Sequence, residues 1–321
     1  MRKKTILWLS VGTALVLLGC AVFFGALAAA GFDFSRFSTV KYEKTTHEIA
    51  ESYSNISVLA DTADVLFVQT EGEITKIECY EQENVKHKAS VKDGTLVVEV
   101  SDTRAWYEHI GIGFGNQLKI TVFLPKGAYG SLTVRADTSD VKIAKEIPLE
   151  SLDVSLSTGD VICQASPTAS LKIKTTTGDV CVSGVATGTL EISTSTGDIE
   201  ALGITCTGDA SIGVGTGEVE LEQFSCKSLS TSGDTGDISL KGVIVSEQLS
   251  IIRSTGDVEL NACDAAEIVI QTSTGDVEGR LLTDKTFVVK TNTGGTKIPQ
   301  GTVGGKCEIT TDTGDIQITI G

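Results

Sequence analysis

The chain has 321 residues, with 42 Asp or Glu against 26 Lys or Arg, and its formal net charge at pH 7 is −16. From residue 131 onward, 27 acidic residues stand against 13 basic ones, so that part carries −14. An acidic surface repels nucleic acid and anionic lipid headgroups, which argues against both as ligands of this part of the chain.

The amino terminus has the pattern of a membrane anchor. Arg2, Lys3 and Lys4 precede an apolar run from Ile6 to Gly31. That run can cross a bilayer of about 30 Å at about 1.5 Å per residue. The basic flank favours a cytoplasmic start with everything after Gly31 outside the membrane. We therefore predict a single-pass membrane protein, with residues 1–31 as flank and anchor, and the bulk of the chain extracytoplasmic.

Two alternatives to an anchor remain open. Ala26-Leu27-Ala28 matches the small-residue pattern of a cleaved signal peptide, although the apolar run exceeds the usual length of such a peptide. Leu17-Leu18-Gly19-Cys20 resembles a lipoprotein signal, but the residues from Ala21 to Ala30 stay apolar where a processed lipoprotein becomes polar.

Between anchor and repeats lie two segments of different composition. The composition of residues 32–45 predicts a polar linker, and that of residues 46–130 predicts an irregular β region. Within that region Thr62-Ala63-Asp64 stands where a turn would be expected, which suggests a degenerate first part of the repeat fold described below. Trp106, Tyr107 and Phe114 fall in a glycine-rich aromatic stretch. We interpret that stretch as a hydrophobic cap of the fold. The alternative is a contact with a protein partner.

Residues 131–321 contain a repeat of nineteen or twenty residues, which is the signature of a stacked architecture. Its marker is the tripeptide Thr-Gly-Asp or a close variant. The markers begin at Thr138, Thr158, Thr177, Thr196, Thr216, Thr235, Thr255, Thr274, Thr293 and Thr313.

Apolar residues alternate on both sides of each marker, as Leu190 and Ile192 do before Gly197 and Ile199 and Ala201 after it. A period of two indicates strands, and glycine suits a chain that reverses within two or three residues. The pattern predicts an all-β fold, a β-solenoid of 19–20-residue coils preceded by one transmembrane helix. Stacked in chain order, its exposed final coil would end at Gly321, leaving an edge open to an end-to-end partner.

The turn carboxylates would form a column along such a solenoid. Like charges about 5 Å apart repel by about 1 to 3 kcal/mol, so something must compensate. We expect each carboxylate to accept backbone N–H groups of its own or the adjacent turn. The alternative is Ca²⁺ between coils. The candidate cation column is Asp160, Asp179, Asp198, Asp237, Asp257 and Asp276.

The threonines that recur two residues apart, as at Thr175 and Thr177, share the phase of the buried apolar residues. We expect both to be inward or corner ladders, which argues against an outward ice-binding face.

Cysteine and histidine give no metal signature. Cys163, Cys263 and Cys307 replace inward apolar residues, and Cys206 and Cys226 are spaced to lie on successive coils, where a disulfide is an option. Without a paired C-x-x-C motif we predict no zinc site. The histidines, at positions 47, 87 and 109, are interpreted as ordinary surface or loop residues.

Catalysis has little support. From residue 131 onward there is no His, Trp or Tyr, and Phe224 and Phe287 are the only aromatic residues. A groove that cleaves polysaccharide with paired carboxylates would normally contain rings on which sugars stack. We therefore predict no catalytic residues, no cofactor and no enzyme activity.

The basic-flanked helix, the run Leu118 to Pro125 and the repeated Thr-Gly-Asp followed by Val or Ile resemble the putative-adhesin family of bacterial β-strand-repeat proteins. The resemblance covers most of the chain from about residue 46. It implies a solenoid in the bacterial cell envelope with no established catalytic activity.

Three hypotheses for function follow. The first is a surface for adhesion or for binding an envelope or host polymer. The second is a regulatory ectodomain that docks a membrane protein through Trp106, Tyr107 and Phe114 in an envelope-stress response. The third and weakest is a polysaccharide-active enzyme. Self-association of the rods is also possible.

Overall fold

The computed structural model describes residues 2–29, 31–32, 41–102, 118–301 and 303–321. Helix α1 (Arg2–Ala29) contains an apolar span, Trp8–Ala29, with a mean hydropathy of 2.3. This length and composition fit a membrane anchor and a signal sequence equally well.

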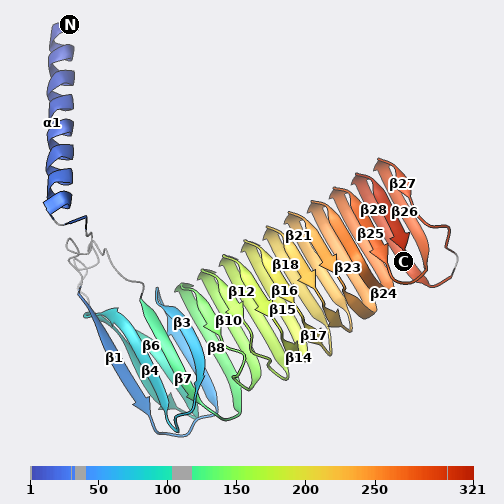
Figure 1. Cartoon of the computed structure of the whole chain (residues 1–321), viewed down its shortest axis with the longest axis horizontal. Helices are drawn as coiled ribbons and strands as arrows, with labels where there is room; N and C mark the ends of the chain where they lie inside the picture. The colour runs from blue at the N-terminus through green and yellow to red at the C-terminus, as the bar shows by residue number, and fades with distance from the viewer. Residues whose placement is uncertain (1, 30, 33–40, 103–117, 302) are drawn as a thin grey trace.

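The rest of the described chain is β structure, which confirms the predicted solenoid (Figure 1). One face consists of strands that lead into the turns, each parallel to the strand of the next coil. From the amino-terminal end of the rod, in spatial order, they are β2 (Asn55–Ala60), β8 (Tyr129–Thr138), β10 (Leu149–Thr158), β12 (Ser170–Thr177), β15 (Thr189–Thr196), β18 (Ala210–Thr216), β21 (Leu229–Thr235), β23 (Ile244–Thr255), β24 (Val258–Thr274), β28 (Gly305–Thr313) and β26 (Lys285–Thr293).

A second face follows the turns. Its strands are β3 (Asp64–Thr70), β9 (Val141–Ile143), β11 (Val161–Cys163), β13 (Val180–Ser183), β16 (Ile199–Leu202), β19 (Val219–Glu222), β22 (Ile238–Lys241), the start of β24, β25 (Val277–Leu281), β29 (Ile316–Ile320) and β27 (Thr296–Lys297). Two-residue strands complete several coils, namely β14 (Ala186–Thr187), β17 (Thr205–Cys206) and β20 (Ser225–Cys226).

The core is a continuous column of the alternating residues that the sequence pattern singles out. Leu190, Ile192, Ile199 and Ala201 of one coil are all buried. The expectation for the paired threonines is confirmed, because the first is inward and the second lies at the corner. Buried Thr175, for example, donates from its hydroxyl to the carbonyl of Thr177 at 3.1 Å. The hydroxyl of Thr175 therefore supplies a hydrogen bond to a backbone carbonyl of its own turn.

The amino-terminal end of the rod is closed by mostly antiparallel strands. They are β1 (Tyr42–Ile49), β4 (Thr75–Gln82), β5 (Val85–Lys92), β6 (Thr95–Asp102) and β7 (Lys119–Pro125). β6 and β7 join the first coil by pairing in parallel with β2 and β3. That first coil packs directly on β8 and β9, and Asp64 occupies its turn. The predicted division of the chain at residue 130 stays a prediction.

The last two coils are stacked in the reverse of their order along the chain. β24 pairs with β28, and β28 pairs with β26; β25, β29 and β27 follow the same order. The coil that ends at Gly321 therefore lies inside the stack. Our expectation that it is the exposed end is wrong, because the coil of β26 and β27 occupies that place (Figure 1).

A hydrogen-bond pattern explains the reversed order. Except at Asp237, the third residue of each turn in the solenoid donates its N–H to a carboxylate of the neighbouring coil on the amino-terminal side of the rod, and Gly295 binds Asp315 in this way at 2.7 Å. Gly295 has no carboxylate to offer to a further coil. A turn without an acceptor suits the end of the stack, whereas Asp315 can bond coils on both of its sides.

Candidate functional site

The turn carboxylates form the predicted column, and each aspartate in it is held by a backbone group. The Oδ1 atom of each turn Asp accepts the N–H of the equivalent residue in the next coil, at 2.7–3.0 Å. Asp179, for example, accepts the N–H of Asp198 at 2.8 Å. A hydrogen bond to a charged acceptor offsets repulsion within the column. Binding of Ca²⁺ by the candidate residues stays a prediction.

One member of the column differs. Glu218 donates its N–H to Asp198 at 2.8 Å, but among the described residues its longer side chain accepts no N–H from Asp237. The column is therefore continuous on both sides of Glu218 and interrupted at it.

The turn glycines bring neighbouring coils into close contact. Gly197 has a φ of +134°, and a Cβ built on it would lie 2.2 Å from the carbonyl oxygen of Gly178 in the coil below. Glycine is required there for its backbone conformation and because no side chain fits between the coils.

The terminal coil, residues 282–304 with β26 and β27, is the open end of the rod. Among the described strands, β26 pairs with β28 alone, so its outer edge presents unpaired backbone groups. Val288 is 51% exposed and Val303 65% exposed, while the inward-facing Phe287 is only partly buried. The terminal coil therefore combines a free strand edge with apolar side chains.

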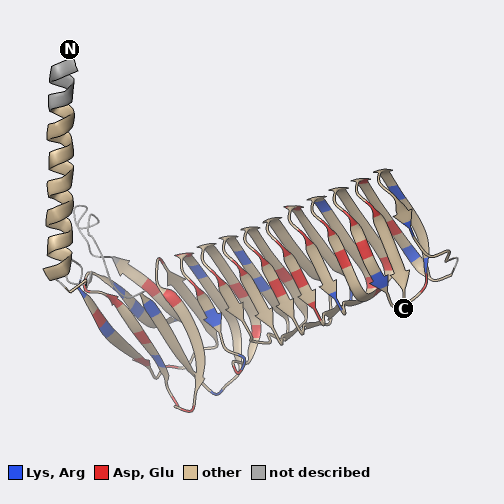
Figure 2. Cartoon of the chain, turned by 45° about the horizontal axis from the view of Figure 1, so that its top comes forward, with Lys and Arg blue, Asp and Glu red and all other residues tan. Residues whose placement is uncertain are grey.

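The charge of the terminal coil also differs from that of the rod. Residues 282–304 contain three lysines and one aspartate, whereas the chain from residue 131 onward carries −14. Lys285 is buried and paired with Asp264, so Lys290 and Lys297 are the exposed lysines of this coil. Figure 2 shows Lys and Arg on this end and acidic residues along the flank. A partner that approaches end-on therefore meets a less negative surface than one that approaches the flank.

A shallow groove of 810 Å³ lies at the junction between the end strands and the first coils. Its lining includes Leu59, Glu99, Arg135 and Lys174. Arg135 forms an ion pair with Asp153 at 3.1 Å, so its positive charge is partly neutralised within the protein. The groove holds no group of described side chains with an arrangement typical of catalysis.

The predicted partner-contact residues Trp106, Tyr107 and Phe114, and also His109, lie outside the described residues. The cysteines can be placed. Cys163, Cys263 and Cys307 are buried as expected, and burial raises the pKa of the Cys163 thiol to about 12. Cys206 and Cys226 lie on adjacent coils as free thiols.

One histidine corrects the sequence interpretation. His87 was expected at the surface or in a loop, but it is 4% exposed and its Nδ1 lies 2.8 Å from a carboxylate oxygen of Glu81. Both residues face the interior of the end strands because they occupy inward positions of β4 and β5. The sequence signal was present as polar residues at core positions of an alternating pattern.

Comparison with solved structures finds relatives of low identity. A putative adhesin from Bacteroides fragilis is 14% identical, with 86% of this chain and 97% of that chain covered and a TM-score of 0.41. A putative cell adhesion protein from Clostridium sporogenes is 12% identical, with 88% and 100% covered and a TM-score of 0.30. A putative lipid binding protein from Parabacteroides distasonis is 14% identical, with 86% and 96% covered and a TM-score of 0.32.

None of these three names describes an enzyme, and at these scores the likenesses add nothing to the choice of site or ligand. Comparison with curated proteins gives no match. The model of the Toastrack DUF4097 family matches residues 53–221 and 209–321, which together span the solenoid and the end strands other than β1. The chain therefore belongs to the Toastrack DUF4097 family.

Proposed function

We propose that this chain is a non-enzymatic cell-envelope protein, anchored by α1, which presents its solenoid outside the membrane as a binding surface for adhesion. The terminal coil is the proposed contact. The observation that carries the proposal is the edge of β26 that no described strand pairs, beside exposed Val288, at the end of the rod opposite β1 (Figure 1). Unpaired edges and exposed apolar residues favour association with another chain or polymer.

The difference between the two ends of the rod supports the terminal coil as the contact. Its amino-terminal end is closed by β1, β4 and β5, whereas no described strand covers β26. A chain held at its amino terminus presents the opposite end farthest from the membrane. We infer that the open coil is then the first part of the protein to meet a polymer or a protein of another cell.

The test is crosslinking in living cells with a photoreactive amino acid at position 288 of the full-length protein. Ile252 is the matched control, since it is 49% exposed on the flank of the rod against 51% for Val288. Position 288 is expected to capture a polymer or a protein, identified by mass spectrometry, and position 252 is not. Equal capture at both positions, or none at 288, would contradict the proposed contact.

The regulatory alternative rests on Trp106, Tyr107 and Phe114. It predicts that the same photoreactive residue at position 106 captures one membrane protein. Replacement of the three aromatic residues would then abolish that association without lowering the melting temperature.

A further inference from the structure

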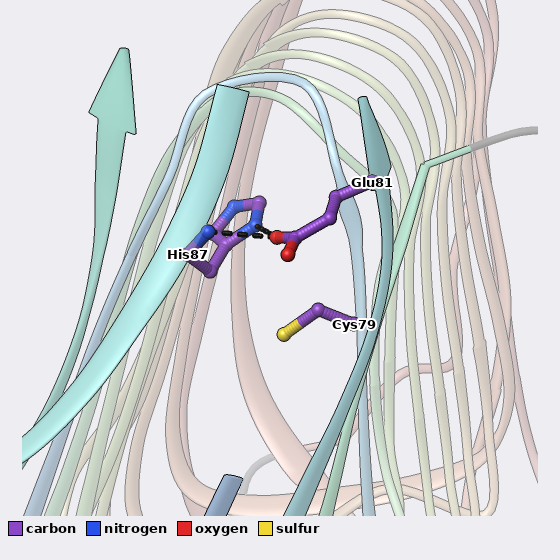
Figure 3. A group of neighbouring side chains, drawn as sticks. All are labelled: Cys79, Glu81 and His87. Atoms are coloured by element: carbon purple, nitrogen blue, oxygen red, sulfur yellow. Dashed lines mark hydrogen bonds and ion pairs between the residues drawn. The ribbon is translucent and has the colours of Figure 1, made fainter. Parts of the chain in front are cut away.

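The end strands contain a buried polar group that the proposed function does not use. Cys79 is 0% exposed, Glu81 1% and His87 4% (Figure 3). One ligand atom from each residue, the thiol sulfur, a carboxylate oxygen and a ring nitrogen, lies within 4.8 Å of the other two. The preceding inward positions of β4 and β5, Ile77 and Val85, are buried and apolar, so these residues interrupt the hydrophobic core.

The local structure brings the three together. Cys79 and Glu81 lie two residues apart on β4 and therefore share its inward face. His87 is at an inward position of β5, which follows β4 through a tight connection that starts at the Gln82–Val85 pair. The group thus occupies one side of a hairpin. Thr45 of β1 covers it and donates its hydroxyl to Oε1 of Glu81.

The hydrogen bonds orient the group but leave it incompletely satisfied. Oε2 of Glu81 accepts the backbone N–H of His87 at 2.7 Å and faces Nδ1 of the ring at 2.8 Å. Nε2 of His87 is buried and has no partner among the described residues. A buried polar atom without a partner is costly, and such exceptions concentrate at functional sites.

We propose that Cys79, Glu81 and His87 form a zinc site that fastens the β4–β5 hairpin to β1. Thiolate, imidazole and carboxylate are the side-chain ligands that Zn²⁺ takes in proteins. Bond lengths of about 2.0 to 2.3 Å place tetrahedral ligands roughly 3.5 Å apart. Atoms at the 4.8 Å limit of the group therefore need to approach by about 1.3 Å, whereas Oε2 of Glu81 and Nδ1 of His87, now 2.8 Å apart, need to separate by about 0.7 Å. Nδ1 is the ring nitrogen that faces the other two ligands (Figure 3).

The proton balance of binding is defined. Zn²⁺ takes the place of the thiol proton of Cys79, which passes to solvent. The proton that Nδ1 of His87 shares with Oε2 of Glu81 moves to Nε2, so the neutral ring binds the metal through Nδ1. A tetrahedral zinc takes a fourth ligand, and the Thr45 hydroxyl, which donates to Oε1 of Glu81, is the neutral side-chain oxygen beside the group. The two hydrogen bonds of Oε2 of Glu81, to the backbone N–H and to Nδ1 of His87, would lengthen as the Glu81 carboxylate turned toward the metal.

The test uses the full-length protein in detergent, stripped with a chelator and titrated with Zn²⁺ or Co²⁺ while released protons are counted. We expect one metal per chain, a thiolate-to-Co²⁺ charge-transfer band and a higher melting temperature with metal. X-ray absorption of the zinc form is expected to show one sulfur neighbour and otherwise nitrogen and oxygen. No stoichiometric binding, no sulfur neighbour or more than one sulfur would each overturn the proposal.

Paired variants locate the site. Cys79→Ser is expected to lower zinc affinity by at least about 100-fold, more than changes outside the ligand set usually cause. Cys307→Ser makes the same change at an equally buried cysteine of the solenoid and is expected to leave affinity unchanged. Unaltered binding in Cys79→Ser, or equal loss in both variants, would overturn the assignment. If Cys79→Ser does not fold, the absorption result on the unmodified chain decides.

The zinc site is independent of the proposed binding surface. Loss of metal should lower the stability of the end strands and leave crosslinking at position 288 intact while the solenoid is folded. The two proposals can therefore fail separately.

Discussion

The smallest features that hold this rod together are the single residues of its turns. Each turn glycine adopts a φ that other residues avoid and lies against a backbone carbonyl of the neighbouring coil. The following carboxylate accepts an N–H from the coil above. One position thus sets the spacing of the coils and the next position links them, which gives a physical reason for the repeated tripeptide.

Replacement of Gly197 by Ala should destabilise the protein severely. The added Cβ would clash with the Gly178 carbonyl at 2.2 Å, and strained backbone adds about 1 to 3 kcal/mol. Gly184→Ala is the control, because Gly184 also has a positive φ, +65°, but a Cβ added there would meet nothing within 4 Å. Denaturant unfolding measures both. Equal losses would show that conformation alone, and not contact between coils, requires the glycine.

Asp179 tests the hydrogen-bonded column. Asp179→Ala removes the acceptor of the Asp198 N–H and should cost about 0.5 to 1.5 kcal/mol, whereas Asp179→Asn keeps an acceptor and removes charge repulsion. Asn should therefore be at least as stable as Asp at low salt. Glu218→Ala is the control and should have a smaller effect. A melting temperature that rises with Ca²⁺ in the parent but not in Asp179→Asn would instead support the cation column.

The buried cysteines predict a loss of stability in alkali. Burial raises the pKa of Cys163 from 9.0 to about 12. Above pH 9 the unfolded thiol loses its proton while the folded thiol keeps it, so stability falls as pH rises between these values, by about 1.4 kcal/mol per pH unit for one such group. Cys163→Ala should flatten the decline. Unfolding by urea on both sides of pH 9 measures it, and an unchanged slope would contradict the assignment.

At the scale of the strand, most elements repeat one pattern, and β23 is an exception with a clear local adjustment. Arg253 occupies an inward position equivalent to that of Thr272 in β24 and is buried. Its Nη1 donates to the carbonyl of Val214 at 3.1 Å, while Nε and Nη2 have no partner among the described atoms. Gly233 of β21 lies directly beside it and leaves room for the guanidinium.

Desolvation lowers the pKa of Arg253, because burial penalises its charged form. Arg253→Met keeps the reach of the side chain and removes the buried charge, so it should raise stability by about 1 kcal/mol. Arg135→Met, at an exposed arginine, should change stability little. Thermal unfolding checks both. A clear loss in Arg253→Met would show that the bond to Val214 outweighs the cost of desolvation.

At the scale of the whole molecule, the distinctive feature is the reversed order of the last two coils. Thr274 lies beside Thr313 and not beside Thr293, although Thr293 is nearer along the chain. Adjacent strands are about 4.8 Å apart, within the range that a disulfide spans, and strands two places apart are about 9.6 Å apart, beyond it.

Cysteines introduced at Thr274 and Thr313 should therefore form a disulfide on oxidation, and those at Thr274 and Thr293 should not. Both pairs are exposed at the same corner, so accessibility is matched. Mass spectrometry of the linked peptides distinguishes them from the native thiols. Linkage of the 274–293 pair alone would show that the coils follow chain order.

Much of the solenoid could be predicted because its information is local and repeated. The alternation around Gly197 identified strands, and their burial confirms which residues face inward. The end strands have no period, so their antiparallel pairing was not predicted. The group of Cys79, Glu81 and His87 was missed because its members meet only through the hairpin, and none forms a familiar spacing.

The sequence by itself determined the fold class, the coil length, the inward residues and the acidic flank, because each depends on neighbours within one repeat. Only the tertiary structure decided which coil is last, which strands close the amino-terminal end and which polar residues share its interior. Those features depend on contacts between coils that equivalent repeats could make in more than one order. Gly295 marks the end of the stack, yet its meaning becomes clear only when the acceptor of its N–H is known.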